Sequence, residues 1–372
     1  NSVTFRSPNE PGEIHVVGFL SSIGHARIKF VGSHHTTTLN LETHSEGVDR
    51  LFEDSVNVGA GESAIVSTGP LGGTITIDGD VDGVADEGNL AEDLVIEAGM
   101  GDVVILGSVG LNEPLRNFTI VSARNVTIYG GVHVTGDFKI LNTTGKVRIG
   151  VAQQGNPVGN TTAGSIDIVG GSQISFEGNV QTTSAAASIS IRLSAPNAAS
   201  GNITFKQTVT TNGDLVVDSA RNLLFSDVVS VFGLLRQVSG SGLTRFQKAV
   251  SADDVDLQVA NLTFDSALSV SAVGNVLLTA DEIDFKGGDN TVTSMGTDTS
   301  RITLRPISPL TQIRSGSAAG VNPGILDLNN QDILAIADQF NDVFIGWEGA
   351  GDPAVSGSLT ALTAIASGGS DQ

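Results

Sequence analysis

The chain has 372 residues, of which 40 are acidic and 19 are basic, and its formal net charge is −21. This acidic balance, with no basic patch interleaved with aromatic residues, argues against a nucleic-acid partner. No apolar run approaches the ~20 residues that a membrane span requires. Apolar residues make up 40 % of the chain, charged residues 16 %, and 46 positions are glycine. This composition favours packed strands and tight turns over disorder.

Residues 1–73 are predicted to form short strands without a clear repeat. The expected strands are Ile14–Phe19, Ala26–Val31, Thr36–Leu41 and Ala64–Ser67. They form either an N-terminal cap or coils of a divergent cross-section, because terminal repeats of solenoids are commonly atypical. Three histidines here, His34, His35 and His44, are the nearest to a metal-ligand set. Adjacent strand residues point to opposite faces, so we expect exposed polar histidines instead.

A pattern of apolar–x–apolar–x–x–x–Val recurs from residue 74 to residue 290. Its copies begin at Ile75, Val103, Val126, Ile174, Ile203, Leu223, Thr244, Leu262 and Ile283, mostly 18 to 29 residues apart. Isoleucine or phenylalanine fills the second apolar position of every copy. Valine or leucine fills the closing position, except in the last copy, which has Asp289 there. Val147 and Ile149, in the one wide gap, suit a degenerate copy. Repeats of this length are typical of solenoids.

A second alternating apolar pair precedes most copies, for example Leu215 and Val217 before Leu223. Small-residue corners such as Ser122–Asn125 and Ser219–Asn222 join the two pairs. Such a unit of two or three short strands cannot enclose a core alone, but stacked coils bury a continuous interior. We therefore predict an all-β fold, a right-handed parallel β-helix (β-solenoid) about 60 Å long at ~4.8 Å per coil. A β-sandwich would not align phenylalanines at one offset, and an α/β fold needs longer connections.

The regular solenoid is expected over residues 74–310, between the divergent coils or cap at 1–73 and a terminal unit at 311–372. Three excursions, Asp82–Asp93, Val151–Ser165 and Ser194–Asn202, are expected to project from one side as a binding face. In the terminal unit, Asn330 suits a helix N-cap, and a short helix would present the apolar face Ile333, Ile336, Ala337 and Phe340. Strand Val343–Trp347 follows, and the residues beyond Gly349 resemble a linker.

Asp78, Asp80 and Asp82 form the D-x-D-x-D-G opening of a calcium loop, in which alternate carboxylates converge on a hard cation. The bidentate glutamate that such a loop needs at its twelfth position is Asn89 here. Val81 belongs to the repeat and would point inward, which places the three aspartates on an outer strand face. They are thus a candidate Ca²⁺ site, and the alternative interpretation is an acidic strand face that is exposed to solvent.

Enzymatic chemistry is not indicated by any motif in the chain. Parallel β-helices include pectate-lyase-like enzymes, yet one Trp and one Tyr leave little for sugar stacking. Asp253 and Asp254 with Arg245 and Lys248 come closest to an acid–base patch, and a charge pair in a turn is the simpler interpretation. Among six Asn-x-Thr sequons, Asn142 and Asn160 lie in expected turns and are the candidate glycan acceptors.

Two stretches, Gly101–Val132 and Gly213–Val229, carry a phrase that resembles the strand repeats of filamentous haemagglutinin-type bacterial exoproteins. The matching positions are Gly101, Asp102, Gly107, Val109, Gly110, Pro114, Leu115, Phe118, Ile120 and Ala123. Ile325–Gly346 is similar to a short helix-bearing unit of such proteins, and the resemblance spans about residues 74–346. It implies a β-helical shaft for adhesion, cell contact or matrix, and it implies no catalytic residues.

These observations together predict a secreted or cell-surface, non-enzymatic structural module. Its partner would be a cell-surface or matrix component, or copies of itself joined head to tail or laterally through unpaired strand edges. We expect it to be one piece of a longer exported protein. The alternative is a β-helix enzyme, a lyase or hydrolase acting on polysaccharides.

Overall fold

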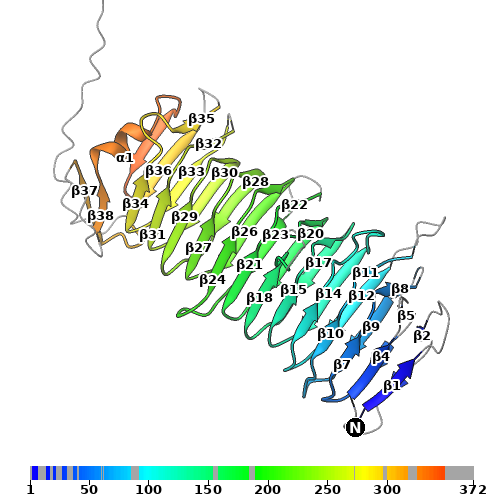
Figure 1. The fold of residues 1–372 in the computed structure, drawn as a ribbon. Helices are drawn as coiled ribbons and strands as arrows, with labels where there is room; N and C mark the ends of the chain where they lie inside the picture. The colour runs from blue at the N-terminus through cyan, green and yellow to red at the C-terminus, as the bar shows by residue number, and fades with distance from the viewer. Residues whose placement is uncertain are drawn as a thin grey trace, which may run out of the picture.

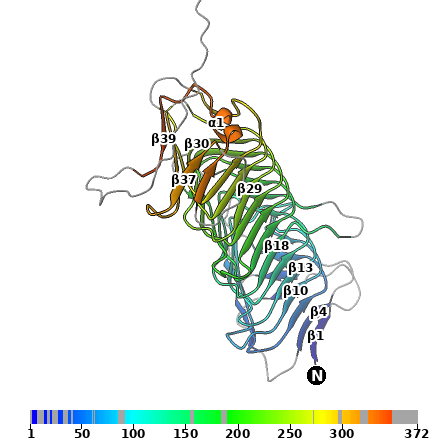
Figure 2. The ribbon, with the colours of Figure 1, turned by 90° about the vertical axis from the view of Figure 1, so that its left-hand side faces the viewer.

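The computed structural model describes residues 2–6, 14–16, 20–21, 27–31, 37–39, 42–59, 61, 63–84, 92–153, 158–183, 189–271, 273–295, 300–316 and 325–347. Over these residues the chain winds into an elongated stack of coils (Figure 1). Turned by 90°, the stack shows its strands running across the long axis, coil after coil (Figure 2). The predicted parallel β-helix is therefore confirmed.

One wall of the solenoid, sheet A, has 15 strands that are all parallel, which at ~4.8 Å per strand is about 70 Å. In spatial order they are β1 (Ser2–Arg6), β4 (Arg27–Val31), β7 (Arg50–Phe52), β10 (Ile75–Ile77), β13 (Val103–Ile105), β15 (Val126–Ile128), β18 (Lys146–Ile149), β21 (Gln173–Phe176), β24 (Asn202–Phe205), β27 (Asn222–Phe225), β29 (Leu243–Phe246), β31 (Asn261–Phe264), β34 (Glu282–Phe285), β38 (Ile325–Leu328) and β37 (Gln312–Ser315).

The second wall, face B, follows sheet A in each coil. Its strands are β2 (Ile14–Val16), β5 (Thr37–Leu39), β8 (Val56–Val58), β11 (Val81–Asp82), β16 (Val132–His133), β19 (Thr161–Ala163), β22 (Val180–Thr182), β25 (Val209–Thr211), the first parts of β28 (Val229–Gln237) and β30 (Val250–Gln258), β32 (Leu268–Val270) and β35 (Val292–Ser294). Single bridges at Val109 connect β11 to β16.

The third wall, face C, returns the chain to sheet A. It is built by β3 (Leu20–Ser21), β6 (Glu42–His44), β9 (Ser63–Ser67), β12 (Asp93–Glu97), β14 (Asn117–Ser122), β17 (Asp137–Ile140), β20 (Ser165–Val169), β23 (Ile189–Ser194), β26 (Asp214–Ser219), the second parts of β28 and β30, β33 (Val276–Thr279), β36 (Arg301–Arg305) and β39 (Asp342–Ile345). The strands of residues 1–73 thus pair in the same three walls as the later ones.

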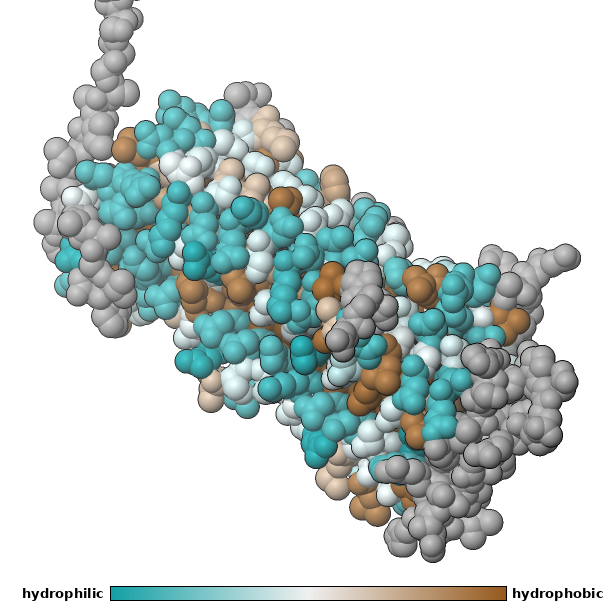
Figure 3. Space-filling model, viewed as in Figure 1, coloured by the Kyte–Doolittle hydropathy of each residue, from teal (hydrophilic) through white to brown (hydrophobic). Residues whose placement is uncertain are grey.

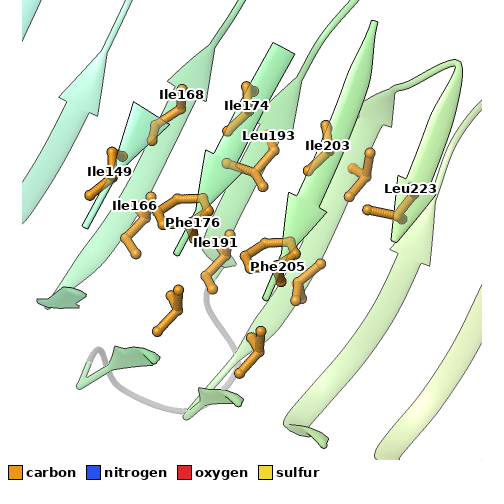
Figure 4. Packing of buried hydrophobic residues seen from close by; sticks show 14 of the residues in the cluster. Ile149, Ile166, Ile168, Ile174, Phe176, Ile191, Leu193, Ile203, Phe205 and Leu223 are labelled. Carbon is orange, nitrogen blue, oxygen red and sulfur yellow. The ribbon is translucent and has the colours of Figure 1, made fainter. Parts of the chain in front are cut away.

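The apolar positions of the repeat face the inside of this three-walled tube. Side chains from sheet A and face C, such as Phe176 and Leu193, meet across the interior in the close-up (Figure 4). Each strand buries alternate residues because successive strand side chains point to opposite faces. Ile203 and Phe205 are fully buried, whereas Thr204 between them is half-buried. Equal offsets in the sequence therefore become equal depths inside the tube.

The aligned phenylalanines form one continuous stack. Phe176, Phe205, Phe225, Phe246, Phe264 and Phe285 have successive ring centroids 5.0, 4.8, 4.9, 4.9 and 5.6 Å apart. The first four pairs lie within 6° of parallel. This spacing is the inter-strand distance itself, so the backbone ladder sets the ring contact. Phe118 and Phe138 stack in the same way on face C.

Two details of the repeat are settled by strand register. Val147 and Ile149 occupy β18 between β15 and β21, which confirms the degenerate copy. In the last copy, Leu268 pairs with Val292 rather than with Asp289, because a longer turn precedes β35. In that turn Gly288 and Asn290 adopt φ of 99° and 54°. The inward valine is therefore present there, three positions later than the pattern predicts.

The corners are held by Asn and Asp side chains that bond to the next coil. Asn125 Oδ1, for example, accepts the Lys146 backbone N–H at 2.9 Å. Asn117, Asn222, Asp214 and Asp254 do the same for their following coils at 2.8 to 2.9 Å. A glycine often precedes the donating amide, and a Cβ at Gly145 would lie 2.2 Å from Asn125 Oδ1. Recurrent Gly–Asx corners thus satisfy backbone groups that leave the strand ladders.

The C-terminal unit departs from the regular winding. Strand β38 lies between β34 and β37, although β37 precedes it in the chain. The expected helix exists as α1 (Asn330–Ala335), but its N-cap is Asn329, not Asn330. Asn329 and Asp332 form a reciprocal capping box, which fixes that start. The helix ends at Ala335, short of Phe340, because its C-cap Ile336 is extended and pairs with Val292.

The outer surface in the view of Figure 3 is largely hydrophilic, with apolar residues gathered in a few patches. Many charged residues pair between adjacent coils, as Arg124 does with Asp102 at 2.6 Å and Arg192 with Asp218 at 2.7 Å. Within the described residues, none of the helices has the length and hydropathy to cross a membrane.

Candidate binding groove

A groove runs along the corner between sheet A and face B, across the four successive coils that contain β10, β13, β15 and β18. It encloses about 470 Å³. Its walls are Asp80, Leu106, Gly107, Ser108, Leu111, Tyr129, Gly130, Gly131, His133, Gln153, Val158, Gly159 and Asn160. We call this set the corner groove. It is open to solvent, since Leu111 is 55 % exposed and Val158 39 %.

Glycines let the coils approach closely at this corner. A Cβ at Gly130 would lie 2.2 Å from Ser108 Oγ, and one at Gly131 would lie 2.2 Å from the Asn160 carbonyl oxygen. Both distances are far shorter than a real contact, so only glycine fits here. The floor of the groove is therefore backbone, and the larger side chains stand around it.

Tyr129 and His133 flank this glycine floor. Tyr129 is the only tyrosine of the chain, and His133 is the only histidine beyond residue 44. Tyr129 follows the last inward residue of β15, and His133 follows the first inward residue of β16. Burial lowers the pKa of His133, so its imidazole is neutral at pH 7 and offers one hydrogen-bond donor and one acceptor.

The polar groups of the corner groove are mostly uncharged. Asp80 is the one acid among the described residues of its lining, and its Oδ1 accepts the Ser108 backbone N–H at 2.7 Å. Gln153 and Asn160 add amides, while Leu106, Leu111 and Val158 add apolar surface. An aromatic side chain, amides and apolar walls suit an uncharged polar ligand. The single acid and the net charge of −21 disfavour an anionic one.

The three aspartates of the candidate calcium loop have separate environments. Asp82 is buried and accepts hydrogen bonds from the Asn112 backbone N–H at 3.1 Å and from its amide at 2.8 Å. Asp80 bonds to Ser108, and Asp78 is exposed. Over the described part of the chain, no group of three or more His, Cys, Asp or Glu side chains is placed to hold a metal ion.

The two candidate glycan acceptors differ in their exposure and bonding. Asn142 is exposed two residues after the end of β17, and its backbone carbonyl accepts the Ala123 N–H. Asn160 lines the corner groove, and its Oδ1 accepts the Asn179 backbone N–H at 3.0 Å. A glycan on Asn142 would project into solvent, whereas one on Asn160 would fill the groove.

The remaining candidates are not brought together as a catalytic set. His34 and His35 lie outside the described residues. His44 Nδ1 lies 3.2 Å from Ser67 Oγ, and its Nε2 lies 3.7 Å from Glu46 Oε2. Arg245 pairs with Asp265 at 2.6 Å rather than with Asp253 or Asp254. Asp254 accepts the Asn275 backbone N–H, a structural role at a corner.

The three excursions do not share one side, contrary to the prediction. Asp82–Asp93 leaves the corner between faces B and C, and Val151–Ser165 leaves the corner between sheet A and face B. Ser194–Asn202 connects face C to sheet A, where it borders a smaller hollow of about 270 Å³. Each corner of a three-walled coil tolerates an insertion, because the strand ladders on either side remain paired.

The corner groove was not identified from the sequence. The sequence signal for the groove is the single tyrosine and an isolated histidine on either side of Gly130 and Gly131. The rest of its lining comes from three other repeats. Comparisons with protein-family models, with curated proteins and with solved structures found no match.

Proposed function

We propose that this chain is a non-enzymatic structural module of a secreted or cell-surface protein, a stiff shaft that carries an adhesive surface. The observation that supports this most is the unbroken interior. Sheet A continues through 15 parallel strands, and its inward positions are buried in every strand from β7 to β34. Such a stack holds surface groups at fixed spacing along a long axis, which is what a shaft requires.

The corner groove is the proposed contact with the partner, a cell-surface or matrix component. It lies on the side of the shaft and not at an end, so a partner can reach it while the coils continue in both directions. Tyr129 would supply an aromatic surface, and His133 and Asn160 would supply hydrogen bonds.

Binding of the fluorescently labelled chain to cells and to immobilised matrix glycans tests this proposal. We expect saturable binding by the natural sequence and at least a tenfold weaker binding by Tyr129→Ala. Phe232→Ala is the matched control, because Phe232 is 60 % exposed on β28, away from the groove. Equal binding by all three proteins, or none, would argue against an adhesive groove.

Self-assembly is a second candidate, favoured by apolar groups near the C-terminal unit. Leu310 is 86 % exposed, Val343 on β39 52 % and Leu334 on α1 46 %. Face C ends at β39 among the described residues, so one edge of β39 has no neighbouring strand there. Electron microscopy separates the candidates: fibres with an axial repeat near the shaft length support assembly, and dispersed rods support adhesion alone.

The enzymatic alternative can be tested at the same groove. Among the described residues of its lining, Asp80 is the single acid and is bonded to backbone, so these residues offer no pair of opposed carboxylates of the kind used in glycoside hydrolysis. Incubation with neutral and acidic polysaccharides, with and without Ca²⁺, should give no new reducing ends or unsaturated products. Measurable cleavage would replace the structural proposal.

A further inference from the structure

Arg50 lies inside the solenoid, in a position that the repeat otherwise fills with apolar residues. In β7, Arg50 and Phe52 are buried and Leu51 between them is half-buried. Arg50 pairs in register with Ile75, whose row continues through Val103 and Val126. Among the described residues it is the one buried arginine or lysine, with 1 % of its surface exposed.

The guanidinium of Arg50 is incompletely satisfied. Its Nε donates to Ser45 Oγ at 3.0 Å, and Ser45 Oγ in turn donates to the Val48 carbonyl. Nη1 and Nη2 are both buried, and neither has a hydrogen-bond partner within the described part of the chain. The four N–H bonds of these two atoms form the wide end of a planar fork that fits anions.

Among the described residues, the surroundings of Arg50 include polar side chains but no compensating charge. The buried polar residues of the same coils include Ser45 and Thr68, each with 0 % of its surface exposed. Thr68 Oγ1 donates to the Gly73 carbonyl, so its proton is already used. Burial lowers the pKa of Arg50 to about 10 and is the only cause of that shift, so no described carboxylate offsets it. At pH 7 the side chain is still positively charged.

The arginines on the outside provide the contrast. Arg124, Arg192 and Arg314 each contact an aspartate of a neighbouring strand at 2.5 to 2.7 Å. An exposed pair contributes little to stability, but a buried charge without a counter-charge is strongly unfavourable. A neutral water molecule would satisfy N–H groups of Arg50 without balancing its charge.

We infer that Arg50 anchors a buried site for a small monovalent inorganic anion, held by its Nη1 and Nη2 atoms inside the N-terminal coils. One guanidinium balances one negative charge, so a monovalent anion leaves the interior neutral. A divalent anion such as sulfate would leave an uncompensated charge. The strand spacing of ~4.8 Å between coils also favours a compact ion over an organic acid.

The test is reversible unfolding of the full chain, refolded from urea in sodium chloride, sodium nitrate or sodium gluconate at equal ionic strength. Gluconate is too large for the proposed site. A ligand that binds only the folded state raises the unfolding midpoint. We expect the thermal midpoint to be roughly 2–5 °C higher in chloride or nitrate than in gluconate. Equal midpoints in the three salts would overturn the proposal.

Two variants separate the site from general salt effects. Arg50→Met replaces the charge with an apolar chain of similar length and should abolish the difference between salts. Arg124→Met removes a surface arginine and should retain it. If Arg50→Met does not fold, bromide-soaked crystals of the natural sequence decide the question. Anomalous density within hydrogen-bond distance of Arg50 Nη1 or Nη2 supports the site, and bromide found only on the surface refutes it.

Discussion

The central coils, residues 174–285, and the C-terminal unit, built from β37, β38, α1 and β39, use the same strand pairing in opposite ways. In the central coils one inward row is phenylalanine throughout, and its six rings stack about one strand spacing apart. Where β34 meets β38, the register instead places Glu282 beside Asp327. Parallel in-register stacking amplifies whatever a row contains, whether aromatic contact or like charge.

The like-charged row has measurable electrostatic consequences. Burial first, and then Asp284, Asp327 and Asp332, raise the pKa of Glu282 to about 7. Burial likewise raises the pKa of Asp332 to about 6, although its carboxylate accepts the Phe285 and Asn329 backbone N–H groups. Arg314 and Lys286 offset part of the charge through Asp327 and Asp284. The junction between β34 and the C-terminal unit is thus the pH-sensitive part of the molecule in this comparison.

The largest expected effect comes from interrupting the phenylalanine stack. Phe225 is fully buried between Phe205 and Phe246, at 4.8 and 4.9 Å. Phe225→Ala should lower the free energy of unfolding by about 3–5 kcal/mol, through lost burial and a cavity. Urea unfolding followed by circular dichroism measures it. Phe232→Ala is the control, and a similar loss in both variants would contradict the role of the stack.

Glu282→Gln should stabilise the C-terminal unit in a pH-dependent manner. The pKa of Glu282 is higher in the folded chain than in the unfolded chain. Its contribution to the free energy of unfolding is therefore fully present below the unfolded pKa and is lost as the pH rises toward 7. The variant should therefore gain about 1–2 kcal/mol at pH 8, after allowance for the partial exposure of Glu282. At pH 4 it should gain nothing.

Hydrogen exchange of the β38 backbone amides, corrected for the intrinsic dependence of exchange on pH, measures this change in local stability. Glu113→Gln, on an exposed residue, is the matched control. A gain that is the same at pH 4 and pH 8 would show that the charge of Glu282 is not responsible.

A smaller effect is expected at the corners. Asn125 donates to Asp102 Oδ1 and accepts from the Lys146 N–H, both at 2.9 Å. Asn125→Ala leaves that amide without its partner and should cost about 1–2 kcal/mol by urea unfolding. Asn142→Ala, at an exposed asparagine, should be nearly neutral. Equal costs would mean that the corner bonds do not contribute.

The smallest effect is expected from the surface ion pairs between coils. Arg192 and Asp218 lie 2.7 Å apart, and the Arg192 side chain is 51 % exposed. Arg192→Met should lower the free energy of unfolding, measured with urea, by no more than about 0.5–1 kcal/mol, and by less in high salt. A larger loss would indicate that the outer charge rows, and not the interior, hold the coils together.

The interior could be predicted closely because its signal is local and repeated. Ile203 and Phe205 recur at one offset in many copies, and a strand buries every second residue wherever it packs. The corner groove could not be predicted, because Tyr129, Asp80 and Asn160 are far apart in the sequence. Only the length of each coil decides which of them become neighbours. Asp82 is an example, since Asn112 of the next coil donates a hydrogen bond to its carboxylate.

The sequence by itself determined the strand repeat, the inward rows and the parallel stacking. These follow from the alternation of side chains every two residues in a strand and from the recurrence of the pattern once in each coil. The tertiary structure alone decided the three-walled winding, the placement of β38 between β34 and β37, and the burial of Arg50. These depend on the register of each coil against its neighbours, which is the outcome of packing many rows at once.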